Sequence, residues 1–357
     1  MVWAGLFSAR SVHTGGASLA VDVLFAEVSD HASIIGLREL ERVDPRPNPL
    51  VWWATDKALW LMQQVYGGVR VELEGTIPDL REPVLLAMNH SHYYDFMPSR
   101  HALWRQLGFK SITFTKARAY QNRLEGLFVK GIGNVPLVSR GYLISADFAV
   151  VHGRKPSEEE YRLVREHVDR GRALPSTPAF ERLLSEPRDM LDVPFDPRVS
   201  SYRDALNARY FEAMQVSVGQ ARRVIDAGVC LHIYPQGLYS TRLSRGRIGT
   251  VQFALALDIP IVPVGFSGMN ELFATANMVP RRAGTLTMRF GQPRRVHGEE
   301  FADFVPFDPA HEQRVRAALE RETDALMDAI NELLEPSYQW GEDRAGNGRV
   351  GVSRFFD

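Results

Sequence analysis

A histidine and an aspartate five positions apart occur in the segment MNHSHYYDF, residues 88–96. The preceding residues 83–89, PVLLAMN, form a short apolar run that predicts a buried strand, with His90 at its carboxyl end. Ligands of α/β sheets bind in the crevice at the carboxyl ends of the strands. A carboxylate such as Asp95 holds an imidazole in one tautomer and stabilises its protonated form, while the neutral ring accepts a proton from a hydroxyl near neutral pH. The pair therefore suits a general base at the edge of a sheet, but a His and an Asp at this spacing are also common as a purely structural hydrogen bond, and the two residues alone leave both alternatives open.

His92 opens a second interpretation of the same residues. HSHYYD resembles the start of the His-x-His-x-Asp-His zinc pattern of the metallo-β-lactamases, but position 94 is Tyr and Asp95 is followed by Phe96. A zinc hydrolase would need further ligands, and the remaining candidates lie at no spacing typical of a metal site: His101, His152, His167 and His232. We therefore predict no metal and expect His92 to form structural hydrogen bonds.

Four segments in one order resemble the glycerolipid acyltransferase family, which includes the lysophosphatidic acid acyltransferases. NHSHYYD is similar to the NHxxxxD block, and GNVPLVSR, residues 133–140, to a second block that ends in arginine. LHIYPQGLYS, residues 231–240, resembles a third block usually written FPEGTRS, and IPIVPVGFSG, residues 259–268, a fourth. A glycine pattern that follows the third block also occurs, as RIGTVQFALAL. The resemblance covers about residues 50–295.

The resemblance implies an O-acyltransferase that takes part in phospholipid biosynthesis. It would move a fatty acyl group from a thioester, acyl-CoA or acyl-carrier protein, to a hydroxyl of a lysophospholipid or related glycerolipid. His90 would be the general base and Asp95 its orienting partner. No cofactor is implied beyond the thioester co-substrate, because that bond is already activated and no acyl-enzyme is needed.

The same resemblance implies a set of substrate-binding residues. Lys116 and Arg140 match positions where the family places cations, and both side chains suit a phosphate group. The full set that the resemblance implies is Asn89, Lys116, Arg140, Gln236, Gly237 and Arg242. Gly237 would allow the backbone to approach a ligand closely, or it is a plain turn glycine.

The third block departs from the family. Gln236 replaces the usual Glu, and the Arg of Glu-Gly-Thr-Arg is missing in register, where Tyr239 stands. Gln236 can still form hydrogen bonds but carries no charge, and Arg242 or Arg245 would have to replace the lost cation. The departure leaves two alternatives open: an acceptor other than lysophosphatidic acid, or a catalytically impaired member of the fold that binds lipid or acyl-CoA.

Composition narrows the possible functions. The chain has 357 residues, 45% of them hydrophobic, which suits a globular protein with a sizeable core. A net charge of −1 gives no support to a nucleic-acid partner. The single cysteine, Cys230, excludes an intrachain disulfide and a cysteine-based zinc site, and it fits a reducing compartment.

Strand-like and helix-like segments alternate along the chain, which predicts an α/β fold. We expect a mixed sheet flanked by helices, with an N-terminal helical element and a helical insertion. The predicted division is an N-terminal extension at 1–50, an acyltransferase domain at 51–305 that contains a charged, proline-rich insertion at about 141–218, and a terminal helix and tail at 306–357.

Residues 51–68, VWWATDKALWLMQQVYGG, predict a tryptophan-rich amphipathic helix. Trp and Tyr suit a bilayer interface, because the ring is apolar and its polar atom stays wet. The helix either packs on the body of the protein or docks on a membrane surface, and one helix can do both. No run of about 18 apolar residues predicts a transmembrane segment, and no signal peptide is evident. We therefore expect a cytoplasmic protein that is peripheral on the membrane.

Overall fold

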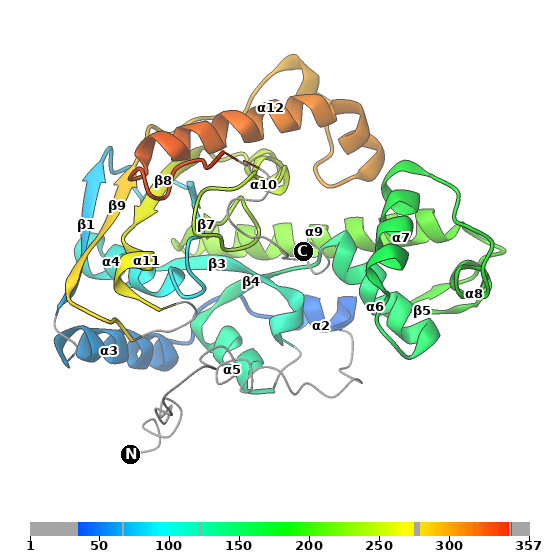
Figure 1. The fold of residues 1–357 in the computed structure, drawn as a ribbon, viewed down its shortest axis with the longest axis horizontal. Coiled ribbons are helices and arrows are strands. Elements are labelled where there is room, and N and C mark those ends of the chain that lie inside the picture. The colour runs from blue at the N-terminus through cyan, green and yellow to red at the C-terminus, as the bar shows by residue number, and fades with distance from the viewer. Residues whose placement is uncertain (1–34, 66–67, 121–122, 275–278, 343, 345–357) are drawn as a thin grey trace. The chain divides into compact units, whose positions relative to one another are not determined.

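The computed structural model describes residues 35–65, 68–120, 123–274, 279–342 and 344 (Figure 1), all of which belong to one compact unit. The strands are β1 (Val69–Gly75), β2 (Leu85–Met88), β3 (Ser111–Lys116), β4 (Asn134–Leu137), β5 (Arg188–Met190), β6 (Val193–Phe195), β7 (Cys230–Ile233), β8 (Ile261–Ser267) and β9 (Gly284–Phe290). The α-helices are α2 (Leu37–Arg42), α3 (Pro49–Val65), α4 (Phe96–Leu107), α5 (Arg123–Ile132), α6 (Arg140–His152), α7 (Glu158–Arg170), α8 (Pro178–Ser185), α9 (Tyr202–Asp226), α10 (Gly249–Leu257), α11 (Met269–Leu272) and α12 (Pro309–Leu333). Two short 3₁₀ turns complete them, η1 (Ala117–Tyr120) and η2 (Glu299–Phe301).

Seven of the described strands form one mixed sheet in the order β1-β9-β8-β2-β7-β3-β4. The five strands from β8 to β4 run parallel, whereas β9 pairs antiparallel with β8. The carboxyl ends of β8, β2, β7, β3 and β4 therefore meet at one edge of the sheet. This arrangement confirms the predicted α/β class and brings segments far apart in the sequence to a common edge.

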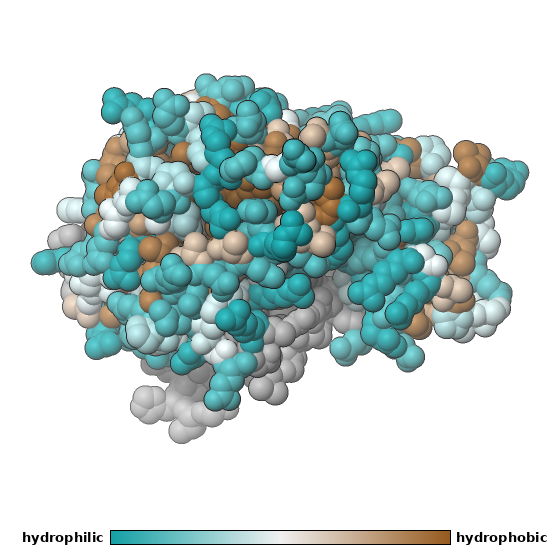
Figure 2. Space-filling model, turned by 90° about the horizontal axis from the view of Figure 1, so that it is seen from above, coloured by the Kyte–Doolittle hydropathy of each residue, from teal (hydrophilic) through white to brown (hydrophobic). Residues whose placement is uncertain are grey.

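Helices cover both faces of the sheet. The long helices α9 and α12 and the shorter α10 pack on one face, and the side of the molecule over α12 and α10 is mostly hydrophilic (Figure 2). On the other face α4 packs against the sheet, and α3 in turn contacts α4 and α5. The terminal helix α12 is thus part of the main core.

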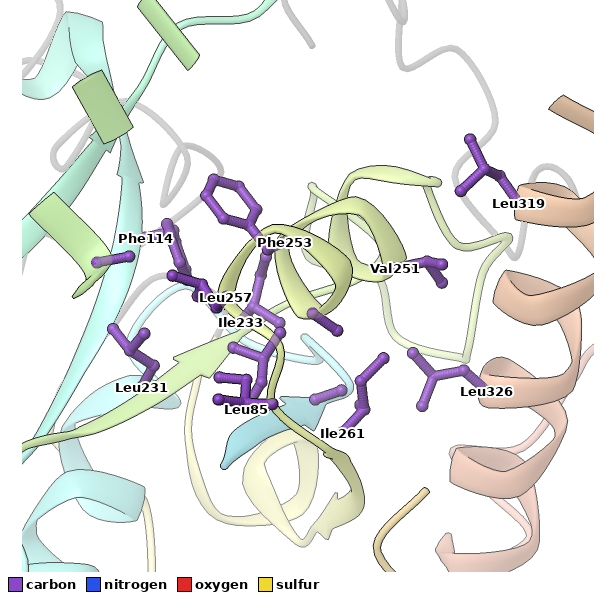
Figure 3. Close-up of a cluster of buried hydrophobic side chains, with 14 of the residues drawn as sticks. Leu85, Phe114, Leu231, Ile233, Val251, Phe253, Leu257, Ile261, Leu319 and Leu326 are labelled. Atoms are coloured by element: carbon purple, nitrogen blue, oxygen red, sulfur yellow. The ribbon is translucent and has the colours of Figure 1, made fainter. Parts of the chain in front are cut away.

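The central position of β2 in the sheet explains why its sequence is a continuous apolar run. All four of its residues are buried, because alternate side chains enter two different cores. Leu85 and Ala87 join the core beneath α10, where Leu85, Ile233 and Phe114 face Val251 and Phe253 (Figure 3). Leu86 and Met88 enter the core beneath α4.

The segment expected as a helical insertion, residues 141–218, contains most of α6, then α7 and α8, and the hairpin of β5 and β6. A third buried cluster holds these elements together with α2 and η1. The helix α9 crosses position 218 without a break, so the segment is continuous with the helix that covers the sheet. The predicted division into domains stays a prediction, and most of the expected extension 1–50 lies outside the described residues.

Candidate active site

His90 and Asp95 are in direct contact at the carboxyl edge of the sheet. His90 Nδ1 lies 3.1 Å from Asp95 Oδ1 and 3.0 Å from Asp95 Oδ2. Since a carboxylate only accepts, we assign the proton to Nδ1, which makes Nε2 the unprotonated nitrogen in the neutral form of the ring. The His90 side chain keeps 17% of its surface exposed, whereas the Asp95 side chain is completely buried. The site thus offers one basic nitrogen on a ring that a buried carboxylate orients.

A short turn between β2 and α4 brings the two residues together. Asp95 is the residue before the first turn of α4, and its backbone N–H donates to His92 O over 3.2 Å. Its Oδ2 also accepts from the backbone N–H of Ser91 at 3.0 Å and of His92 at 3.3 Å. These donors stabilise the ionised carboxylate in its buried place.

Asn89 anchors the residue before His90 to the neighbouring strand. Its Nδ2 donates to Phe266 O over 2.9 Å, and its Oδ1 accepts from Phe266 N–H over 2.7 Å. The side chain therefore continues the hydrogen bonding between β2 and β8 past the end of β2. Both polar atoms of this buried amide are hydrogen-bonded to the backbone of Phe266. Asn89 therefore helps to position His90 and does not point toward the exposed edge of the sheet.

Gln236 holds the backbone of His90 from the β7 side. Its Oε1 accepts from His90 N–H over 2.8 Å, and its Nε2 donates to the hydroxyls of Ser240 and Ser244, each at 2.7 Å. Ser240 N–H in turn donates to His90 O over 2.8 Å. The neutral amide is therefore used as both acceptor and donor, a combination that a carboxylate lacks.

Replacing Gln236 with leucine is expected to destabilise the protein by about 1–3 kcal/mol, because it leaves buried hydrogen-bonding groups unpaired. Urea denaturation measures the loss. The control is Gln292→Leu, which removes an exposed bond to Thr76. A loss no larger than that of the control would show that the Gln236 contacts are not needed.

Gly237 occupies a position that other residues fit poorly. Its φ is +72°, in the left-handed region, and an added Cβ would lie 2.7 Å from Arg247 Nε. Arg247 thus crosses directly over this glycine, and its Nε donates to Gln236 O over 3.4 Å.

Tyrosines that the sequence analysis did not select surround the His90 ring. Tyr234 stacks on it with a centroid distance of 4.2 Å and an interplanar angle of 23°, and Tyr239 meets it edge-on at 5.9 Å. Tyr93, 38% exposed, contacts Tyr239 in turn. The buried Tyr234 hydroxyl lies near Asp95, and burial together with that carboxylate raises the pKa of Tyr234. Their position inside the third block could have identified Tyr234 and Tyr239 as site residues from the sequence.

Three cationic side chains lie near this site, one at the end of β3 and two in the loop after β7. Lys116 is the last residue of β3, and the exposed Arg247 lies at Gly237. Arg242 is also exposed, and its Nη1 donates to the carbonyls of Gln339 and Trp340 at 3.5 and 3.4 Å. Arg247 was not selected from the sequence, although its place two residues before the glycine of GTVQFALAL was the signal for it.

Arg140 lies in a different environment. Its Nη1 and Nη2 donate to the two carboxylate oxygens of Glu312 at 3.2 and 3.3 Å, and its guanidinium stacks on Tyr210 at 4.2 Å. Arg140 and Glu312 are both buried. The resemblance implied a phosphate ligand here, whereas these contacts are those of an internal ion pair between α6 and α12.

The second histidine of the motif has both ring nitrogens in hydrogen bonds. His92 Nε2 donates to Ala274 O over 2.8 Å, and Nδ1 accepts from Tyr94 N–H over 3.2 Å. Burial lowers the pKa of His92, so it is neutral at pH 7. Across the part of the chain that the structure describes, no group of three His, Cys, Asp or Glu side chains is arranged to hold a metal ion.

Comparisons with known proteins found one weak structural similarity and no match in sequence. No family model and no curated protein matches the chain. Among solved structures, it is similar to the 1-acyl-sn-glycerophosphate acyltransferase PlsC from Thermotoga maritima, at 14% identity over 80% of this chain and 79% of that one, with a TM-score of 0.35. A similarity this low carries no argument about function, so the case rests on the side chains themselves.

Proposed function

We propose that the chain is an O-acyltransferase that moves a fatty acyl group from a thioester, acyl-CoA or acyl-carrier protein, to a hydroxyl of a lysophospholipid or related glycerolipid. The contact between His90 Nδ1 and the buried Asp95 carboxylate carries the proposal. It is supported by the place of the pair at the edge where parallel strands end, and by the sequence blocks that bring Gln236 and Tyr239 to it.

In the proposed reaction His90 Nε2 removes the proton from the acceptor hydroxyl. The resulting oxygen attacks the thioester carbonyl, a tetrahedral oxyanion forms, and it collapses as the C–S bond breaks. The imidazolium gives its proton to the departing thiolate, so His90 returns to its neutral state. Asp95 stabilises the imidazolium through Nδ1–H during the attack.

A phosphate on either substrate would meet the cations of this edge. Lys116 and Arg242 were implied by the resemblance, and Arg247 joins them because it crosses Gly237 beside Gln236. We propose that Asn89 and Gln236 are positioning residues, which hold the backbone at and just before His90 in place. Arg140 is left out of this set because Glu312 pairs with its guanidinium.

Thiol release from palmitoyl-CoA and from palmitoyl-carrier protein tests the proposal. The purified chain is assayed against lysophosphatidic acid, other lysophospholipids and uncharged lipid alcohols. Acceptor-dependent release supports the transfer and identifies the acceptor. Thioester binding without release from either donor, by folded protein, would instead support a lipid-binding member of the fold.

The acceptor would be reached from a membrane surface, and α3 has a suitable face. Leu50, Trp53, Trp60 and Leu61 are 77%, 61%, 47% and 55% exposed, and their spacing places them together on one side of the helix. Lys57 lies between them with its Nζ 6.0 Å from the Trp60 ring centroid. The opposite side of α3 is buried through Trp52 and Leu59, so packing on the body leaves an apolar, tryptophan-bearing face outside.

We propose that this face docks on an anionic bilayer, as a peripheral contact. Within the described residues no helix has the length and apolar character to span a membrane. The face lies on α3, whereas the mostly hydrophilic surface of Figure 2 lies over α12.

The double variant Trp53→Ser/Trp60→Ser is expected to bind vesicles of mixed neutral and anionic phospholipid at least about tenfold more weakly, because each buried aromatic ring contributes about 1.5–3 kcal/mol. Vesicle co-sedimentation measures the affinity. The control is Val199→Ser, since Val199 is 84% exposed but lies after β6. An equal loss in both proteins would contradict docking through α3.

A further inference from the structure

A small cavity, partly open to solvent, lies between α3, α4 and the end of α5. Its apolar lining includes Leu59, Met97, Trp104 and Ile132, and its volume is about 30 Å³. One water needs a cavity of roughly 10–15 Å³. The cavity therefore has room for a compact group of one to a few atoms.

Arg100 of α4 lines this cavity, and its positive charge has no ion-pair partner among the described residues. The residue is 5% exposed, its Nη2 donates to Ile132 O over 2.7 Å, and its buried Nη1 has no partner within the described residues. Burial lowers the pKa of Arg100 to about 9. Because a guanidinium stays protonated in proteins, this shift reports a desolvated positive charge.

The titratable groups near Arg100 do not neutralise it. Burial, with a smaller contribution from Arg100, lowers the pKa of His232 to about 3, and burial raises the pKa of Tyr234, so both are neutral at pH 7. Asp56 also lines the cavity, but its carboxylate already binds His101 Nδ1 at 2.7 Å and Arg105 Nη2 at 2.5 Å. Among the described residues, no carboxylate forms an ion pair with Arg100.

Trp52, which also lines the cavity, carries a second unpaired donor. Its ring lies under the Arg100 guanidinium, with 4.4 Å from Cζ to the ring centroid, and its buried Nε1–H has no partner within the described residues. The indole N–H and the guanidinium Nη1 are both donors without acceptor capacity. A ligand that satisfies both must accept hydrogen bonds, and one that also balances the charge must be negative.

We propose that this cavity binds a compact monovalent anion, a halide or the head of a small carboxylate, held by Arg100 Nη1 and Trp52 Nε1. Burial of the guanidinium strengthens its attraction to an anion, because the surrounding protein has a lower dielectric constant than water. The anion would connect α3 to α4, the helix that begins directly after Asp95. This site is separate from the acyl-transfer proposal and does not depend on it.

Thermal unfolding and calorimetry of the full-length protein in halide-free buffer test the proposal. Sodium bromide and sodium acetate are titrated separately, with ionic strength held constant by sodium methanesulfonate. We expect one or both to raise Tm saturably. Trp52→Phe keeps an aromatic ring under the guanidinium and removes the N–H, so it should weaken the affinity by about tenfold or more, because a hydrogen bond to the charged ligand is lost. Trp340→Phe removes an indole N–H that donates to Asp328 Oδ1 over 3.1 Å and lies outside the cavity lining, so it should leave the affinity unchanged.

Tighter binding of bromide would identify a halide site, and tighter binding of acetate a carboxylate site. Arg100→Met, if it folds, should abolish both. No saturable response to either anion, or equal responses in the wild type and Trp52→Phe, would overturn the proposal and leave a cavity that holds water only. Because the readouts are Tm and affinity, a failure here is distinct from a failure of acyl transfer.

Discussion

His90→Ala is expected to reduce acyl transfer by at least about 10²–10⁴-fold, the range that a positioned general base contributes. The variant removes the nitrogen that takes the acceptor proton in the proposed reaction, while the Lys116 and Arg247 cations and the Gly237 turn stay in place. The comparison of thiol release rates at saturating donor and acceptor measures the loss.

The fold should survive this change. The backbone N–H and C=O of residue 90 still bind Gln236 and Ser240, and Asp95 keeps the N–H groups of Ser91 and His92. Circular dichroism and urea denaturation verify this. His297→Ala is the matched control, because that exposed histidine contacts only a backbone carbonyl of Arg295 within the described structure. A His90→Ala protein that transfers acyl groups at the wild-type rate would refute the mechanism.

The sequence could predict the centre of the site because its determinants are local. A buried apolar strand followed by His90, and Asp95 five positions later, needs only one turn to bring the side chains together. The mixed, partly parallel sheet was likewise predictable from the alternation of strand-like and helix-like segments. The hydrogen-bond partners of Gln236 and Arg140 were not predictable, because these partners, His90 and Glu312, lie 146 and 172 positions away in the sequence.

In the insertion, too, some features were predictable from the local sequence and others were not. Its helices were predictable from charge and spacing, and α7 even begins with a complete capping box at Ser157. The hairpin of β5 and β6 was not predicted, since its strands have three residues each. Its turn places Leu191 and Asp192 at φ of 53° and 64°, where glycine or asparagine would have been the usual signal.

Arg140→Ala is expected to destabilise the protein by about 3–5 kcal/mol, because it leaves the buried Glu312 carboxylate without its bidentate partner. Glu312 is 4% exposed, and Gln252 Nε2 is a second buried donor to its Oε2, over 3.2 Å. Urea denaturation measures the loss, and the acceptor KM of the remaining folded protein should not change.

Arg316→Ala provides the matched control, since Arg316 binds the same carboxylate at 3.2 Å but with a side chain that is 53% exposed. Because the Arg316 end of this pair stays in water and Arg140 still neutralises Glu312, we expect its loss to cost at most about 1 kcal/mol, so this variant should be nearly as stable as the wild type. The double variant Arg140→Met/Glu312→Leu should recover most of the stability, because it removes both charges together. The opposite pattern, a stable Arg140→Ala protein with a raised KM for a phosphate-bearing acceptor alone, would return Arg140 to the phosphate-binding role that the motif implied.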